Sequence, residues 1–358
     1  MGLTVSTAAL TGCHGVRRAD LEGTGGGLSP IPGLDDRRIE VLKYASLAPS
    51  GHNTQPWAVK VVSRDEWLIQ ADHDRMLPEV DPDRTELLLS LGAFVENLVL
   101  AAGALGFSTR IRVEARTSRD RDVVRVGLEE DRPIKYPLKR LTARRTVRNG
   151  LRNNELKAAH LDRLEACLPG HVFYFPRSSD HARCLEEGTV EAFRRQTARD
   201  PVQAELAGWL RLDNASARTY RDGLTVESME IGGFKALYVR LFMGPSDALK
   251  PSFRKAGLTA VTRQVREGGG WLVVTGQGDT PADLIAAGRG FERMALLCRE
   301  MGLALHPMSQ MLEEEWGGKE IQAHHPQGIK PRFILRVGYL DRYPDPVSLR
   351  RPVEWFVT

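Results

Sequence analysis

Residues 48–57, Ala-Pro-Ser-Gly-His-Asn-Thr-Gln-Pro-Trp, form the segment of the chain best suited to hold a flat polar heterocycle. Two prolines restrict the backbone, and Gly51 permits the close approach of a ligand. The backbone amides and the side chain of Asn53 offer hydrogen-bond donors and acceptors to the edge of such a ring. The same composition also suits an ordinary connection between a helix and a strand, in which Asn and Gln only satisfy the turn.

A run of basic residues at 144–148 is the second candidate for binding chemistry. It reads Arg-Arg-Thr-Val-Arg and precedes a predicted helix. Each guanidinium presents a fork of donors that matches a phosphate, and the start of a helix adds a favourable electrostatic field. A solvated basic patch is the alternative interpretation of the same residues.

The 48–57 segment resembles the signature loop of the FMN-dependent nitroreductase family. Its His-Asn pair followed by Gln-Pro-Trp is especially similar to the long, internally duplicated branch of that family, the Acg-like proteins, and so are the runs 71–75 and 81–84. The resemblance implies that Gln55 and Trp57 anchor this loop. It also implies that four residues of the loop lie near the isoalloxazine ring of FMN: Pro49, Ser50, Gly51 and Asn53.

The basic run resembles the element with which the family grips the ribityl phosphate, Arg-x-Ser-x-Arg/Lys, with a threonine in place of the serine. By this resemblance the phosphate ligands are Arg144, Arg145, Thr146 and Arg148. In the homodimeric relatives, each flavin lies at the subunit interface, between the phosphate element of one chain and the loop of the other. Here the loop lies in the first half and the phosphate element in the second, and the pair Arg37-Arg38 makes a poor second phosphate site. The resemblance therefore implies one complete FMN site per chain.

Two further segments resemble parts of the family's site. The closing segment that follows 337–339, Val-Gly-Tyr, brings a basic residue to the phosphate, which is Arg350 or Arg351 in this chain. The segment 306–310 follows the second long predicted helix, where the family approaches flavin N5, although the usual Glu-Gly pair is absent. We expect a hydrogen bond from the backbone of Met308 or Ser309 in its place.

The function that the resemblance implies is that of an FMN-dependent oxidoreductase, which passes two electrons from NAD(P)H to a small organic acceptor such as a nitroaromatic or a quinone. The flavin itself carries the chemistry in such enzymes, so no catalytic side chain is expected. The alternative is a protein that binds FMN for storage with little turnover, in which the region from about 196 to about 243 acts as a lid.

The pattern of apolar residues predicts the elements that position these segments. Helical patterns predict two long buried helices at 84–106 and 281–302 and two shorter ones at 35–47 and 154–168. β-rich runs predict strands at 57–63, 67–71, 109–114, 123–128, 172–175, 271–275 and 333–338. The candidate loop therefore lies between a helix and a strand.

The two long predicted helices align with each other at one constant offset. The aligned pairs are Gly92 with Gly288, Glu96 with Glu292, Leu100 with Leu296, and Gly106 with Gly302. Two unrelated core helices that each end in a glycine cap are the alternative, but the similar placement of neighbouring strands favours a duplication. We therefore predict an α+β, nitroreductase-like fold rich in antiparallel strands, with two degenerate halves, 31–135 and 136–358, fused as a pseudo-dimer.

The composition restricts the class of protein and its partners. A chain of 358 residues with 42% hydrophobic residues can build a large core, and 50 Lys and Arg against 46 Asp and Glu give no sign of a nucleic-acid partner. The four cysteines lack metal-ligand spacing, so neither a metal site nor a disulfide framework is expected. We expect no membrane-spanning helix, a small-molecule acceptor as partner, and either a monomeric pseudo-dimer or a homodimer.

The first 30 residues leave two localisations open. As written, the segment 1–30 is a flexible leader, and the protein is expected to be a bacterial cytoplasmic one. Residues 10–13, Leu-Thr-Gly-Cys, resemble the lipobox of a bacterial lipoprotein signal. That resemblance implies an exported lipoprotein anchored through Cys13 if translation starts upstream.

Overall fold

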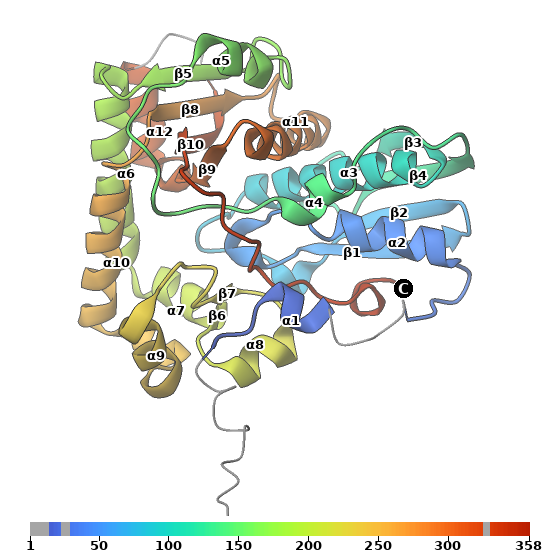
Figure 1. Cartoon of the computed structure of the whole chain (residues 1–358), viewed down its shortest axis with the longest axis horizontal. Helices are drawn as coiled ribbons and strands as arrows, with labels where there is room; N and C mark the ends of the chain where they lie inside the picture. Colours follow the sequence, from blue (N-terminus) through green and yellow to red (C-terminus); the bar gives the residue numbers. More distant parts are fainter. Residues whose placement is uncertain (1–13, 23–28, 325–329) are drawn as a thin grey trace, which may run out of the picture.

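A computed structural model describes residues 14–22, 29–324 and 330–358 of the chain. The protein has a mixed α+β fold built around two four-stranded sheets, as the sequence predicts (Figure 1). Cys13, on which the alternative localisation depends, lies outside the described residues.

The first sheet has the strand order β1-β2-β4-β3, and all its neighbouring strands are antiparallel. Its strands are β1 (Trp57–Ser63), β2 (Glu66–Ala71), β3 (Phe107–Val113) and β4 (Asp122–Glu130). β2 lies inside the sheet, and all but the first of its residues are buried. The edge strand β3 instead alternates between more and less exposed positions, which is the pattern of a strand with one face in solvent.

The second sheet repeats this arrangement with the strand order β5-β8-β10-β9, again antiparallel throughout. Its strands are β5 (Val172–Pro176), β8 (Gly270–Thr275), β9 (Leu303–Pro307) and β10 (Pro331–Tyr339). In both sheets the chain forms two strands, then a long helix, then the other two strands. The fourth strand along the chain inserts beside the second in both cases, so the two sheets share one topology.

The long helices α3 (Thr85–Ala104) and α11 (Pro281–Glu300) pack against each other between the two sheets (Figure 1). Glycine permits their close approach. A Cβ atom on Gly92 would lie 2.4 Å from the carbonyl oxygen of Ile285, and one on Gly288 would lie 2.1 Å from that of Leu89. Each glycine thus faces the carbonyl that lies three residues before the other glycine, so the crossing has an approximate two-fold symmetry.

The core of the molecule extends across both halves. One apolar cluster joins the first sheet and α3 to Leu284 and Ile285 of α11, and Phe356 near the C-terminus belongs to it as well. The chain end leaves the second sheet and returns to the first, where the Thr358 amide donates to the Val59 carbonyl at 2.8 Å (Figure 1). Opposite ends of the sequence are therefore held side by side.

The expectation of no membrane-spanning helix needs one correction. By length and composition α3 could cross a membrane, because its most apolar window has a mean hydropathy of 1.8. However, 78% of that window is buried inside the protein, against the first sheet and α11. The apolar sequence of α3 is thus explained by its place in the core.

A long helical excursion separates β5 from β8, whereas only a tight turn joins β1 to β2 in the first half. Its elements are α6 (Asp180–Ala198), α7 (Asp200–Gly208), β6 (Leu210–Arg211), α8 (Asn214–Tyr220), β7 (Leu224–Thr225), α9 (Gly233–Phe242) and α10 (Pro251–Gln264). This excursion lies along one side of the molecule (Figure 1). It contains the region from about 196 to about 243 that the sequence suggested as a lid.

The remaining helices are α1 (Arg18–Glu22), α2 (Asp36–Ala45), α4 (Lys139–Ala143), α5 (Ala158–Glu165) and α12 (Glu315–His324).

Some predicted elements differ from the observed ones. The helix predicted from residue 154 begins only at Ala158, because the amides of Leu156 and Lys157 donate to the hydroxyls of Tyr174 and Tyr339. Strand β9 was not predicted, since its short apolar run directly follows the long helix α11.

Candidate functional site

A cavity of about 850 Å³ opens where the 48–57 loop, α3, the end of β9 and the helical excursion meet. All the predicted site residues line it except Arg145 and Arg351. Those that do are Pro49, Ser50, Gly51, Asn53, Arg144, Thr146, Arg148, Met308, Ser309 and Arg350. Segments that are far apart in the sequence therefore meet at one cavity whose size suits a small organic ligand.

The loop that forms one wall has an unusual backbone. His52, Asn53 and Gln55 all have positive φ angles, of 45°, 54° and 55°. A residue other than glycine is rarely found there, and each such residue costs on the order of 1–3 kcal/mol unless its surroundings hold it. Such strain is common at ligand sites, so the question is what holds this loop.

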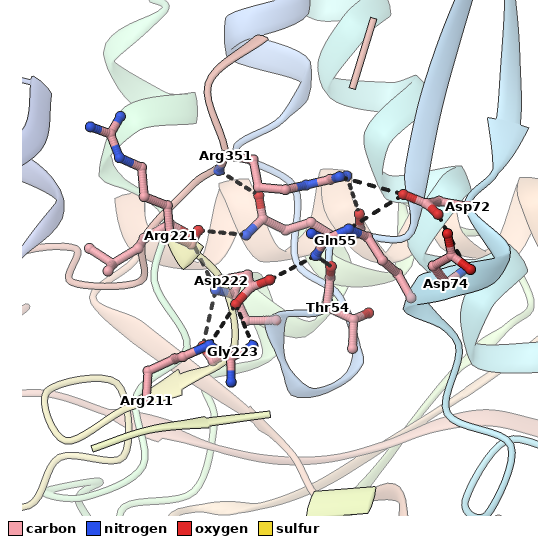
Figure 2. A network of polar contacts seen from close by, with 12 residues as sticks. Thr54, Gln55, Asp72, Asp74, Arg211, Arg221, Asp222, Gly223 and Arg351 are labelled. Carbon is pink, nitrogen blue, oxygen red and sulfur yellow. Dashed lines mark hydrogen bonds and ion pairs between the residues drawn. The ribbon is translucent and has the colours of Figure 1, made fainter. Parts of the chain in front are cut away.

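Gln55 is the central anchor of the loop, as the sequence predicts (Figure 2). Its amide N–H donates to Ser50 Oγ at 2.9 Å, and its side chain donates to the Arg221 carbonyl at 3.0 Å. Its side-chain oxygen accepts from the Arg351 amide at 2.9 Å. Every polar group of the Gln55 side chain is thus used within the protein, which fixes the loop between the excursion and the C-terminal segment.

Two arginines, the buried Arg351 and the partly buried Arg75, complete this anchor. Arg351 donates from Nη2 to the carbonyls of Gln55 and Trp57, at 2.6 and 2.8 Å. Arg75 donates to the Thr54 carbonyl at 2.9 Å and to Asp222 at 2.8 Å. Of the two C-terminal candidates for a phosphate ligand, Arg351 is therefore the wrong one, because its guanidinium is held behind the loop.

Arg350, the other candidate, does line the cavity and connects the C-terminal segment to the loop. It donates to the carbonyls of Leu47 and Ala48, each at 3.0 Å, and to Asn53 Oδ1 at 2.8 Å. The amide nitrogen of Asn53 in turn donates to the carbonyls of Gly223 and Leu349, each at 3.2 Å. The side chain of Asn53 hence holds the loop in place, and the edge of the loop offered to a ligand is mainly backbone.

Arg144 brings the basic run to the same point. Its Nη2 lies 3.4 Å from the Leu47 carbonyl, which also accepts from Arg350, so the two guanidinium groups meet just before the loop. Its Nε lies 3.3 Å from Glu292 Oε1. Both contacts are long for charged hydrogen bonds, so the guanidinium retains capacity to bind an anion.

The partner of Arg144, Glu292, is fully buried in α11. Burial raises the pKa of its carboxyl to about 7, and the nearby Arg144 lowers it only in part. With its amide oriented to satisfy both neighbours, Asn97 donates to Glu292 Oε1 at 3.0 Å and accepts from the Ala48 amide at 3.1 Å. Glu292 and Asn97 thus link the two long helices to the start of the loop.

Arg148 and two histidines form the next part of the wall. Arg148 donates to the Ser228 carbonyl at 3.0 Å, and its Nη1 lies 2.9 Å from His306 Nε2. Burial, together with the charge of Arg148, lowers the pKa of His52 to about 4 and that of His306 well below its ordinary value. Both imidazoles are therefore neutral near pH 7, and the positive charge of this wall resides on the arginines.

Two predicted ligands need correction. The backbone N–H of Met308 donates to the Ile334 carbonyl at 2.8 Å within the sheet, so it is not the donor expected for flavin N5. Arg145 lies outside the lining of the cavity, because Glu230 binds it at 2.8 Å. Pairing with a neighbouring strand thus occupies the Met308 amide, and an ion pair holds Arg145 away from the cavity. Ser309 is the remaining candidate of the Met308–Ser309 alternative.

The sequence reasoning missed a pair of carboxyl groups in the wall. Glu86 from α3 and Glu313, which follows β9, are hydrogen-bonded to each other, and Gln196 donates to Glu313 at 2.7 Å. Burial raises the pKa of Glu313 to about 7 and holds that of Glu86 well above its ordinary range. The charge of nearby Asp81 raises both values further. The pair therefore holds a proton near neutral pH.

No signal in the sequence pointed to this carboxyl pair, since the two residues are far apart along the chain. His52, by contrast, lies inside the 48–57 loop and could have been predicted as a site residue. The stacked rings of Phe291 and Phe333, whose centroids are 4.2 Å apart, also line the cavity. Their positions were predicted only as parts of a helix and a strand.

We predict that the buried carboxyl groups make the folded state less stable as the pH rises. A carboxyl whose pKa is raised by folding stabilises the fold fully below its unfolded pKa and loses that contribution as the pH rises through the folded value, which is about 7 for Glu313 and Glu292. The urea midpoint should thus fall between about pH 5 and about pH 7 and change little above that range.

The variant Glu313→Gln should reduce this slope. Glu315→Gln is the matched control, because Lys319 lowers the pKa of that exposed carboxyl and it stays ionised throughout the range. An equal slope in wild type and Glu313→Gln would contradict the assignment.

Comparison with known proteins gives a distant relationship. Two proteins of Mycobacterium tuberculosis, "Putative NAD(P)H nitroreductase Rv3131" of strain H37Rv and "Putative NAD(P)H nitroreductase MT3217" of strain CDC 1551, are each 27% identical to this chain over 335 residues. The match covers 88% of this chain and 90% of each relative. No protein-family model matches the chain.

A solved structure, "Crystal Structure of the Nitroreductase-like Family Protein from Bacillus cereus", matches with a TM-score of 0.34 and 12% identity. The match covers 62% of this chain and 95% of that one, and a score this low does not establish a common fold. The sequence relationship does establish distant homology to nitroreductase-like proteins, which suggests an oxidoreductase.

Proposed function

We propose that this protein is an FMN-dependent oxidoreductase that uses NAD(P)H to reduce a small organic acceptor. The observation that carries the proposal is the meeting of Arg144 and Arg350 at the Leu47 carbonyl, directly before the strained loop. A rigid backbone edge and a set of guanidinium groups then line one cavity, which are the two features that a flavin ring and its phosphate require. The distant homology to NAD(P)H nitroreductases supports the same assignment.

The chemistry of the cavity wall fits FMN. Three buried polar atoms of the lining, His52 Nδ1, Arg144 Nε and Gln310 Oε1, have no hydrogen-bond partner in the part of the chain that the structure describes. Such atoms each cost about 1–3 kcal/mol when left unsatisfied, so a ligand that supplies partners is favoured. The guanidinium groups of Arg144 and Arg148 suit the phosphate, and the loop 49–53 suits the edge of the ring.

In this assignment each part of the chain has a distinct task. When bound, FMN supplies the two-electron chemistry between NAD(P)H and the acceptor. Arg144 and Arg148 hold the phosphate, and Thr146 adds a hydroxyl beside them. Arg350 and Asn53 position the loop, whose amides then present fixed donors to the ring. The neutral His52 adds no charge near it.

We further propose that the two halves descend from one ancestral half and form a pseudo-dimer of the Acg-like kind. Three observations support this: the shared strand order of the two sheets, the two-fold contact of Gly92 and Gly288, and the positive φ of Gly106 and Gly302 after the two long helices. A crystal structure with different strand orders in the two sheets would contradict the duplication.

The direct test is to purify the protein, add FMN, remove the excess and record the absorption spectrum. We expect a yellow protein with one FMN per chain that oxidises NAD(P)H when a nitroaromatic or a quinone is present. A protein that retains no FMN would refute the proposal. A protein that retains FMN without acceptor-dependent turnover would identify it as an FMN store.

A further inference from the structure

The cavity extends well beyond the arginines and the loop into an apolar chamber. This chamber lies among the helices of the excursion, and Phe193, Leu206, Val239, Phe253 and Val261 contribute to its wall. The charged and titratable groups that line the same cavity include Lys235, the pair Lys250–Asp247, whose charged atoms are 2.5 Å apart, and the carboxyl pair Glu86–Glu313, whereas the five residues named above are apolar. The wall of the chamber is therefore suited to hydrocarbon.

The chamber opens to solvent at helix α9. Tyr238 and Phe242 line the cavity, yet they remain 58% and 70% exposed, so they mark its mouth. Phe234 and Leu241 of the same helix are also exposed, at 93% and 61%. Ala236 and Val239 face inward and are buried, so α9 has apolar residues on both sides. Exposed apolar surface of this kind usually marks a binding site.

We propose that the acceptor reduced by this protein carries a long hydrocarbon tail, which lies in the chamber and leaves past Tyr238 and Phe242. The acceptor class is a quinone with an alkyl or isoprenoid chain. This inference rests on the proposed function, which supplies the electrons. It also explains why the cavity continues into an apolar chamber that opens at helix α9.

The reaction balances without a further reactant. The quinone ring gains two electrons and two protons and becomes a hydroquinone, while NAD(P)H loses a hydride and becomes NAD(P)⁺. The hydride accounts for both electrons and one proton, and water supplies the second proton. The tail takes no part in the chemistry and contributes only the burial of methylene groups.

The test compares two quinones with the same 2,3-dimethoxy-5-methyl head, one with a decyl chain and one without. Calorimetry measures their binding to the full chain with and without FMN, which gives a readout independent of turnover. We expect the decyl compound to bind at least about 100-fold more tightly in both cases, because buried methylene groups add affinity. With FMN and NAD(P)H, kcat/KM should rise in the same order.

A matched pair of variants on α10 locates the tail. Ala260 lines the chamber, whereas Thr259 is exposed and lies outside it. Ala260→Trp should lower the affinity for the decyl quinone at least about tenfold and leave that for the short quinone unchanged, while Thr259→Trp should change neither. If Ala260→Trp fails to fold, Phe253→Ser tests the same wall by removing apolar surface.

The outcomes separate this inference from the proposed function. Equal affinities for the two quinones, or equal effects of the two tryptophan variants, would overturn the inference even if FMN binds and the short quinone is reduced. Tight and Ala260-dependent binding of the decyl quinone to a protein that retains no FMN would support the chamber as a hydrocarbon site and refute the oxidoreductase.

Discussion

Replacing both Arg144 and Arg148 with alanine is expected to weaken FMN binding by at least about 100-fold, because each charge-assisted hydrogen bond contributes about 1.5–3 kcal/mol. Both side chains line the cavity, and the contacts of Arg144 with protein are long, at 3.3 and 3.4 Å. A phosphate would give the Arg144 guanidinium shorter partners. Equilibrium titration of the apoprotein with FMN measures the loss.

Two controls make this result specific. Arg152→Ala removes an arginine from the same segment, but this side chain is 53% exposed and lies outside the lining of the cavity, with an ion pair to Asp341 at 3.2 Å, so FMN binding should not change. Because Arg144 also faces the buried Glu292, the double variant is repeated with Glu292→Gln, which removes the unpaired carboxyl. Unchanged FMN affinity in the double variant would show that the phosphate binds elsewhere.

Replacing Gly288 with alanine is expected to destabilise the whole molecule by about 1–3 kcal/mol or more, because overpacking forces the backbone apart. The new Cβ would lie 2.1 Å from the Leu89 carbonyl of α3, and a backbone atom cannot move aside as a flexible side chain can. Gly92→Ala should act in the same way through Ile285. The midpoint of urea unfolding measures both effects.

Gly318→Ala in α12 is the matched control for this substitution. Among the residues that the structure describes, none comes within 4 Å of the Cβ that would be added there. Alanine favours a helix over glycine by about 0.8–1 kcal/mol, so this variant should be unchanged or slightly more stable. If Gly288→Ala were as stable as Gly318→Ala, the two long helices would not approach each other as closely as described.

The sequence was most informative about the local elements. The strand at 57–63 was predicted at its observed bounds, and the two long helices were predicted to within two residues at each end. Their apolar residues follow a helical period that needs no knowledge of the partner. The elements of the excursion were harder to predict from the sequence. Its two strands have two residues each, and its helices face the cavity and solvent instead of one continuous core.

The candidate site was predicted in part. A loop with fixed backbone and a cluster of arginines are visible in the sequence, and the structure brings both to one cavity. The roles of individual residues were not visible. Gln55 and Arg351 anchor the loop through partners that lie far away in the chain, and the amide of Met308 donates to Ile334 of β10, a pairing that the sequence did not reveal. Hydrogen-bond partners across the fold leave no local pattern.

What the amino-acid order determined by itself is periodic or local: the helices, most of the strands, the glycines of α3 and α11, and the composition of the 48–57 loop. Only the tertiary structure decided that the C-terminal arginines reach that loop, that the carboxyl groups of Glu86 and Glu313 meet, and that an apolar chamber continues from the polar site. The physical reason is that backbone propensity acts between near neighbours, whereas charge pairing and cavity shape depend on which distant segments the core brings together.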